Sequence, residues 1–244
     1  MLIEIETSDF SYVIKLNEEV INYFKQSLPF NTELHVWKEE VYFETPVKIP
    51  KKPDVISIEL GKVYYWPPGK ALCLFYGISE PYTPLIQVGE FVGILDYLRK
   101  IGEGIKATVK IHEIDKELRD QVRTLSKLGY NVATPLINGE RSILASKFIN
   151  DIRLAFVVYI EEYGLHIESE PLYNYSRDLR TVAYTKKLKS IIRKIAKYSR
   201  VDLSEDMKVC ITAVANEINE LPNVVRDVEK VFTVAHKITH GIFS

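Results

Sequence analysis

The stretch that decides the fold of the first half of the chain is Trp66-Pro67-Pro68-Gly69-Lys70-Ala71-Leu72-Cys73-Leu74-Phe75-Tyr76-Gly77. It contains an apolar run over 71–76, and a second short run over 62–66, apolar after Lys62, leads into it. Proline and glycine between the two runs interrupt regular elements and favour turns. We therefore predict two short strands joined by a tight turn.

Further strands are predicted on both sides of this stretch. Runs that are rich in β-branched residues or that alternate apolar with polar residues cover 3–5, 12–16, 55–60 and 105–111. One helix is predicted after the candidate N-cap Asn17, and a shorter one over 91–100. Many short strands, few helices and frequent turns predict a small β-barrel or β-sandwich.

The stretch from Trp66 to Gly77 resembles the signature of the prokaryotic cyclophilin-like family, whose members are small proteins of archaea and thermophilic bacteria with no established function. The resemblance extends back through Leu16-Asn17-Glu18-Glu19 and Leu28-Pro29-Phe30 to Glu39-Glu40-Val41-Tyr42-Phe43-Glu44-Thr45-Pro46-Val47, and forward through Val92-Gly93 to the strand over 105–111. It covers about residues 1–114. It implies a closed cyclophilin-type β-barrel with one or two flanking helices.

The resemblance does not extend to the catalytic residues of classical cyclophilins. Those enzymes carry an arginine in a Phe-His-Arg stretch and a glutamine in a Gln-Gly-Gly-Asp stretch, and neither stretch occurs here. Arg99 is the only arginine before position 115 and lies at the end of a predicted helix. Because similarity of fold does not transfer an activity, no classical prolyl isomerase site is predicted.

The second half of the chain has a different composition. Residues 1–114 hold seven of the 11 glycines and eight of the 11 prolines, which favours turns there and helices afterwards. Helical spacing of apolar residues predicts helices over 115–129, 144–163, 178–200, 204–220 and 223–240, with short strands over 130–137 and 165–168. We therefore predict a mostly α-helical domain over residues 115–244, a bundle of four or five helices that begins at a boundary near Asp115.

Composition and charge exclude several classes of protein. The chain has 46% apolar and 27% charged residues, and its net charge is −1, divided as −4 before residue 115 and +3 after it. This balance gives no overall attraction to nucleic acid or to anionic membranes. No membrane-spanning run or signal peptide is visible, so a cytoplasmic location is expected. Cys73 and Cys210 lie in hydrophobic surroundings, which predicts buried thiols.

The candidate ligand-binding residues are mostly aromatic residues and prolines around the predicted turn. They are Trp37, Tyr65, Trp66, Pro67, Pro68, Gly69 and Phe75. They could form a platform for a peptide or a flat ligand, or they could form a rigid corner that closes the end of the barrel. Glu39 and Glu40, beside Trp37, are expected at a solvated strand edge. No catalytic residue, cofactor or metal site is predicted, although His236 and His240 have the spacing of neighbours on one helix face.

A basic amphipathic helix is predicted over residues 186–200, with basic residues on one side and Leu188, Ile192 and Ile195 on the other. The candidate contact residues are Lys186, Lys189, Arg193 and Lys197. They could bind phosphates or an acidic partner. Alternatively, they form a solvated face, which could pair with the acidic barrel.

Together these features favour a non-catalytic module that binds a small molecule or a peptide at the barrel, with a helical domain for assembly into a homo-oligomer. A first alternative is an enzyme that uses the barrel pocket, such as a divergent prolyl isomerase. A second is a nucleic-acid-associated protein that acts through residues 186–200. The near-neutral total charge makes nucleic acid the less favoured partner, and no membrane partner is expected.

Overall fold

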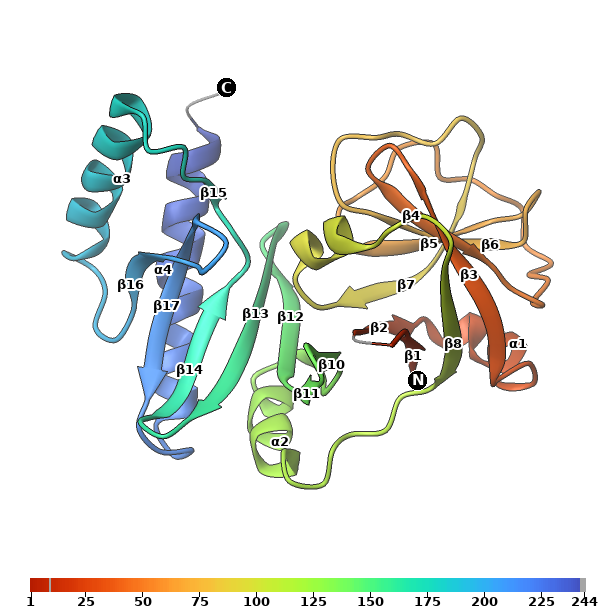
Figure 1. Ribbon diagram of the computed structural model, residues 1–244, viewed down its shortest axis with the longest axis horizontal. Helices are drawn as coiled ribbons and strands as arrows, with labels where there is room; N and C mark the ends of the chain where they lie inside the picture. Colours follow the sequence, from red (N-terminus) through yellow and green to blue (C-terminus); the bar gives the residue numbers. More distant parts are fainter. Residues whose placement is uncertain (9, 242–244) are drawn as a thin grey trace.

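The computed structural model describes residues 1–8 and 10–241. Its first half is a closed barrel of eight antiparallel strands in the order β1-β2-β7-β5-β6-β4-β3-β8 (Figure 1). The strands are β1 (Leu2–Glu6), β2 (Ser11–Leu16), β3 (Phe30–Trp37), β4 (Glu40–Glu44), β5 (Lys62–Trp66), β6 (Ala71–Phe75), β7 (Ile86–Val92) and β8 (Ile105–Ile111). The barrel predicted from the cyclophilin-like resemblance is therefore present.

Apolar side chains at alternate positions along the strands fill the barrel interior. Val41 and Phe43 of β4 and Leu72 and Leu74 of β6 point inward and are buried, while their neighbours along each strand point outward. A short helical segment, η1 (Glu18–Val20) followed by α1 (Ile21–Lys25), adds Val20 and Phe24 to the same core. A helical segment is therefore present after Asn17 as predicted, but the Asn17 side chain makes no capping hydrogen bond.

Two local predictions in the barrel are wrong. The predicted helix over 91–100 is the end of β7 followed by a short 3-10 segment, η2 (Leu95–Lys100), because Phe91 and Val92 pair with β2. The run over 55–60 forms no strand of its own. Only Val55 makes a bridge there, to Leu85.

The second half is a seven-stranded antiparallel sheet with three helices packed against one face. Six strands follow the order β15-β17-β14-β13-β12-β9, and β16 pairs with β17. The strands are β9 (Asn131–Ala133), β12 (Ile143–Ile149), β13 (Ile152–Glu161), β14 (Gly164–Ser169), β15 (Tyr173–Asn174), β16 (Arg200–Leu203) and β17 (Lys208–Ala215). A separate hairpin joins β10 (Leu136–Ile137) to β11 (Glu140–Arg141). The helices are α2 (Arg119–Lys127), α3 (Leu179–Ile192) and α4 (Leu221–His240).

The predicted mostly helical domain over 115–244 is therefore wrong. The region predicted as one helix over 144–163 is instead the β12–β13 hairpin, and the one over 204–220 contains β17. Both faces of β13 are buried, so Leu154 to Val158 is apolar at every position and matches a helical as well as an extended spacing. The helices predicted after Asp115, after Asp178 and from residue 223 are present as α2, α3 and α4, although α3 ends earlier, at Ile192.

The barrel packs on the face of the sheet opposite the helices, which gives the molecule three layers: helices, sheet and barrel (Figure 1). Apolar contacts join Ile94 of the barrel to Leu144, Ala155 and Val157 of the sheet. Arg153 extends from β13 to the barrel and donates to the carbonyl oxygens of Phe91 and Gly93. The two halves therefore share a packed interface.

Both cysteines, Cys73 and Cys210, are free and buried, as predicted. Among the described residues, no helix is both long enough and apolar enough to cross a membrane.

Candidate ligand-binding site

A pocket of about 250 Å³ lies on the outer surface of the barrel, over β4 and β6. It is lined by Trp37, Glu40, Tyr42, Trp66, Cys73, Phe75, Pro81, Tyr82, Thr83 and Leu85. The strand alternation that sends Val41 and Leu74 into the barrel core sends their neighbours along the strands into this pocket. The chain segment after β6, residues 81–85, supplies the remaining wall.

The aromatic walls are held by specific contacts. Trp66 Nε1 donates to Thr83 Oγ1 over 2.9 Å, which ties the end of β5 to the segment after β6. A Cβ on Gly69 would lie only 2.5 Å from the Trp66 ring, so this ring position requires glycine at residue 69. The rings of Trp37 and Tyr82 meet edge to face with centroids 5.0 Å apart.

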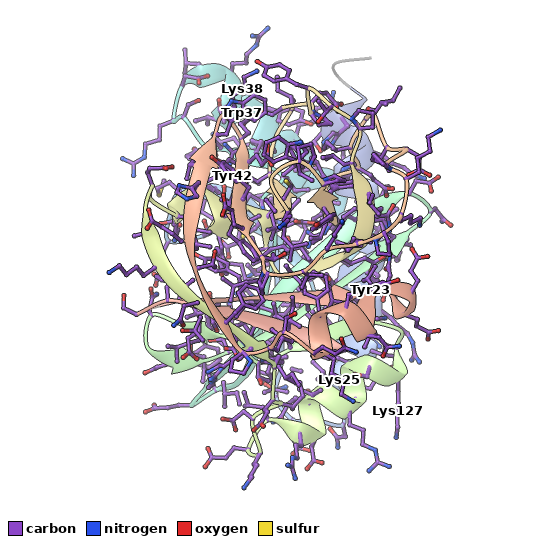
Figure 2. All side chains as sticks on the ribbon, turned by 90° about the vertical axis from the view of Figure 1, so that its right-hand side faces the viewer. Tyr23, Lys25, Trp37, Lys38, Tyr42 and Lys127 are labelled. Carbon is purple, nitrogen blue, oxygen red and sulfur yellow. The ribbon has the colours of Figure 1, made fainter. Side chains whose placement is uncertain are left out.

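Lys38 contacts the rings of both Trp37 and Tyr82. Its Nζ is 4.4 Å from the Trp37 ring centroid and 4.9 Å from that of Tyr82, and it donates to the Tyr82 hydroxyl over 3.2 Å. Figure 2 shows Trp37 and Lys38 together at one end of the barrel, with Tyr42 farther along the same hairpin. The chain thus already places an ammonium group against the faces of two rings of this site.

A carboxyl group and a thiol lie side by side among the lining residues. Glu40 is only 7% exposed, and burial raises its pKa although the Cys73 thiol hydrogen-bonds to it. Burial, with the nearby Glu40 carboxylate, raises the pKa of Cys73 well above its ordinary value. Since the thiolate is the nucleophilic form of cysteine, Cys73 is not an activated nucleophile.

The structure brings three of the predicted ligand-binding residues together. Trp37, Trp66 and Phe75 line the pocket. Tyr65 points into the barrel core, where its hydroxyl donates to the Val47 carbonyl oxygen over 2.9 Å. Pro67, Pro68 and Gly69 form the turn between β5 and β6 and do not line the pocket.

Seven further lining residues were not predicted to bind a ligand: Glu40, Tyr42, Cys73, Pro81, Tyr82, Thr83 and Leu85. The expectation that Glu40 lies at a solvated strand edge is wrong, because the side chain is covered by the pocket walls. The alternation of β6 carried a usable signal: Cys73 is two residues before Phe75 and must share its face. Tyr82 gave no comparable signal, since it lies in an irregular segment.

A larger cavity of about 750 Å³ lies between the barrel and the C-terminal sheet. Charged groups that line it pair with one another: Asp96 with Arg99 and Lys208, and Arg153 with Glu170. We therefore interpret this cavity as a polar part of the interface between the two halves.

Two histidines at the end of α4 also line the larger cavity. The rings of His236 and His240 stack with centroids 3.7 Å apart, and burial with the neighbouring His240 lowers the pKa of His236 to about 4. Within the described residues, no group of three or more histidine, cysteine or acidic side chains is arranged to hold a metal ion.

Helix α3 and the segment after it, which carry the basic contact candidates, lie on the side of the sheet away from the barrel (Figure 1). Lys186 and Lys189 are on α3, whereas Arg193 and Lys197 follow its end. None of the salt bridges between described residues includes any of the four. The suggested pairing of these cations with the acidic barrel is therefore wrong for the part of the chain that the structure describes.

Comparisons with known proteins concern the barrel and part of the remaining chain. Residues 1–110 match the family model described as cyclophilin-like. The solution structure of the hypothetical protein AF2241 from Archaeoglobus fulgidus is similar, with 27% identity over 45% of this chain and 93% of that chain and a TM-score of 0.40. The structure of McbB in complex with tryptophan matches with 18% identity over 52% of this chain and 53% of that chain, at a TM-score of 0.36. No curated protein matches the chain. The match of residues 1–110 to the cyclophilin-like family confirms what the stretch from Trp66 to Gly77 predicts.

Proposed function

We propose that the protein is a binding module whose pocket on the outer barrel surface takes a small molecule, or one side chain of a peptide, with an apolar body. The observation that carries this proposal is the set of five aromatic residues around one pocket: Trp37, Tyr42, Trp66, Phe75 and Tyr82. Ligand sites are typically concave, mostly apolar and supplied with a few polar groups, and here the polar groups are Glu40, Cys73 and Thr83.

The surroundings of the pocket support binding rather than catalysis. Arg99 is not among the lining residues, and it pairs with Glu39 and Asp96 and donates to the Tyr76 carbonyl oxygen. It is therefore not positioned to polarise a prolyl amide held in the pocket. Cys73 is held in its protonated form, which removes the other candidate for chemistry.

Binding can be measured through the fluorescence of tryptophan. The chain contains two tryptophans, Trp37 and Trp66, and both line the pocket. We expect hits from a library of small apolar compounds to change this fluorescence and to raise the melting temperature. A ligand at 100 times its Kd stabilises the folded state by about 2.7 kcal/mol.

A variant of the pocket separates specific from unspecific binding. Tyr42→Ala removes one wall of the pocket and should weaken each hit by about tenfold or more, because the ligand then packs against one aromatic ring fewer. Tyr163→Ala, which removes an exposed aromatic residue of the C-terminal sheet, is the matched control and should leave binding unchanged. Hits that bind both variants like the wild type would contradict the proposal.

We expect no acceleration of prolyl isomerisation above the uncatalysed rate. Rotation about the peptide bond has a barrier of about 20 kcal/mol, and the described pocket lining offers no arginine to lower it. A protease-coupled assay with a proline-containing peptide checks this expectation. A rate that rises with protein concentration and disappears in Trp66→Ala would show that the site is catalytic.

A further inference from the structure

We infer that the ligand of this pocket is an organic cation: a small ammonium group with an apolar body that pairs with the Glu40 carboxylate inside the aromatic walls. This inference rests on the proposed function, because it assigns a chemical class to the ligand of the same pocket. Three observations carry it: the partners of Glu40, the aromatic lining, and the charges around the pocket.

The partners of Glu40 differ from those of other acidic side chains at buried positions. Glu4 accepts from Arg141 at 2.8 Å and from Ser11 at 2.5 Å, and it contacts His112. Glu170 pairs with Arg153 at 2.6 Å, and Asp227 accepts backbone N–H groups from residues 197–199.

Glu40 has neither kind of partner among the described residues; its contact is the weakly donating Cys73 thiol. A buried carboxylate without a cation is costly, and a ligand cation at this position would remove most of that cost.

The aromatic lining favours the same ligand. Indole, phenol and phenyl rings carry negative charge on their faces and attract cations, most strongly where water is excluded. The pocket has five such rings, and neither lysine nor arginine lines it. Because the Lys38 ammonium group already lies over the rings of Trp37 and Tyr82, a ligand cation is expected against the rings of Tyr42, Trp66 and Phe75, over which no described residue places a cation.

A matched pair of probes tests the charge alone. Choline and 3,3-dimethylbutan-1-ol have nearly the same shape, but the first carries a quaternary nitrogen where the second has a carbon. Fluorescence titration should show choline binding at least about tenfold more tightly, a difference within the range of a desolvated cation–π site. Equal affinities would overturn the inference while leaving an apolar pocket that binds small molecules.

The role of Glu40 is tested by Glu40→Gln, with the exposed Glu18→Gln as the matched control. The first variant should weaken choline by about tenfold and change the neutral probe by less than about twofold, because it removes only the counter-charge. The control should bind both probes like the wild type. Unchanged choline binding in Glu40→Gln would also overturn the inference.

A measurement on the wild type keeps the test valid if Glu40→Gln does not fold. Choline has no titratable proton in the accessible range, so the pH dependence of its binding reports on the protein. Affinity should rise with pH as Glu40 ionises, since burial raises the pKa of this carboxyl, whereas the neutral probe should show no such rise. The other ionisable side chains that line the pocket or contact its rings are Lys38, Tyr42, Cys73 and Tyr82. Burial raises the pKa of Tyr42 and of the Cys73 thiol above their ordinary values, so neither gains a charge in the range where Glu40 ionises. A flat profile for choline would contradict the role of Glu40.

The outcomes distinguish this inference from the proposed function. If neither probe binds but neutral library compounds do, the cation is the wrong ligand class and the pocket remains a binding site. If neither the probes nor any library compound changes the tryptophan fluorescence, both the inference and the proposed function are wrong.

Discussion

At the scale of single residues, two buried glutamates of the barrel show how partners decide the state of a carboxyl group. Burial alone would raise the pKa of Glu4, but hydrogen bonds from His112, Ser11 and Arg141 lower it to about 2. Burial raises the pKa of Glu40, although the hydrogen bond from the Cys73 thiol acts in the opposite direction. Glu4 is therefore held in its ionised form by its partners, whereas the Cys73 thiol does not offset the effect of burial on Glu40.

The Glu4 network should make the folded state sensitive to acid. Because its pKa is lowered from 4.5 to about 2 on folding, its stabilisation is fully present above pH 4.5 and is lost as the pH falls toward 2. We expect Glu4→Gln to lower the free energy of unfolding by about 3 kcal/mol at pH 7, as expected when a buried pair loses one partner. Urea denaturation at several pH values measures the difference.

The difference in the free energy of unfolding between the wild type and Glu4→Gln should become smaller as the pH falls below 4.5. Glu18→Gln, at an exposed position, should follow the wild type at every pH and is the control. A difference that does not depend on pH would show that the charge of Glu4 is not what stabilises the fold.

Gly69 determines the position of the Trp66 ring. In Gly69→Ala the new Cβ would lie 2.5 Å from that ring, so either the ring or the turn must move. We expect a loss of about 1–3 kcal/mol of stability, typical of overpacking, together with a shifted tryptophan emission and weaker binding in the pocket. In the control, Gly102→Ala, the atom nearest to the new Cβ is 3.8 Å away, so stability, tryptophan emission and binding should all change little.

At the scale of secondary structure, sequence and structure agree where only one side of an element is buried. The strand over 105–111 alternates cleanly and is β8, and α4 has a polar side and ends at Gly241 as predicted. Where both sides are buried, as over Leu154 to Val158 of β13, every position is apolar and the spacing no longer distinguishes strand from helix. This ambiguity explains why the β12–β13 hairpin was predicted as a helix, whereas the short strands predicted over 130–137 and 165–168 are present in the C-terminal sheet as β9 and β14.

The residues of the ligand-binding pocket were also only partly predictable from the sequence. The aromatic residues Trp37, Trp66 and Phe75 stand out in composition and lie in the pocket. The position of Glu40 depends on the register of β4 with β6, in which it pairs with Phe75, and on the segment that covers it. Neither is encoded in local spacing, so its burial could not be predicted from the sequence.

The turn between β12 and β13 offers a test at this scale. Asn150 and Asp151 have φ values of 46° and 65°, a left-handed conformation that favours Asn-Gly in two-residue hairpins. Asp151→Gly should therefore raise the free energy of unfolding by about 0.5–1 kcal/mol, whereas Asp151→Val should lower it by about 1–2 kcal/mol. Thermal denaturation of the two variants and the wild type measures these changes. If Asp151→Gly and Asp151→Val changed the free energy of unfolding equally, backbone strain at this turn would be negligible.

At the scale of the whole molecule, the sheet is the central layer that joins the barrel to the helices (Figure 1). Ion pairs cross the interface between barrel and sheet, as in Lys100 with Asp206 and Lys208 with Asp96. On the other side of the sheet, α3 and the segment after it carry the basic surface, which consists of Lys186, Lys189, Arg193 and Lys197. A ligand at the outer barrel pocket and a partner at the helices would therefore contact opposite sides of the molecule.

The segment after α3, which carries Arg193 and Lys197, is fixed by the buried carboxylate of Asp227. Asp227 of α4 accepts N–H groups from residues 197–199 and the Ser199 hydroxyl, which fixes the segment after α3 to α4. Lys230 Nζ donates to the Ile195 carbonyl oxygen over 2.7 Å. The arrangement of Arg193 and Lys197 beside α4 thus follows from backbone contacts and does not depend on ion pairs of their own side chains.

The cations of this surface should contribute little to stability. Because Lys189, Arg193 and Lys197 take part in no salt bridge with a described residue, replacing each by glutamine should change the free energy of unfolding by less than about 0.5 kcal/mol. The near-neutral total charge predicts no strong nucleic-acid binding by the wild type. Titration with duplex and single-stranded DNA at several salt concentrations measures this. Two results together would contradict the prediction. The affinity of the wild type for DNA would fall steeply as the salt concentration rises, and the triple variant would reduce the slope of log affinity against log salt concentration by about 0.9 for each duplex phosphate that it no longer neutralises.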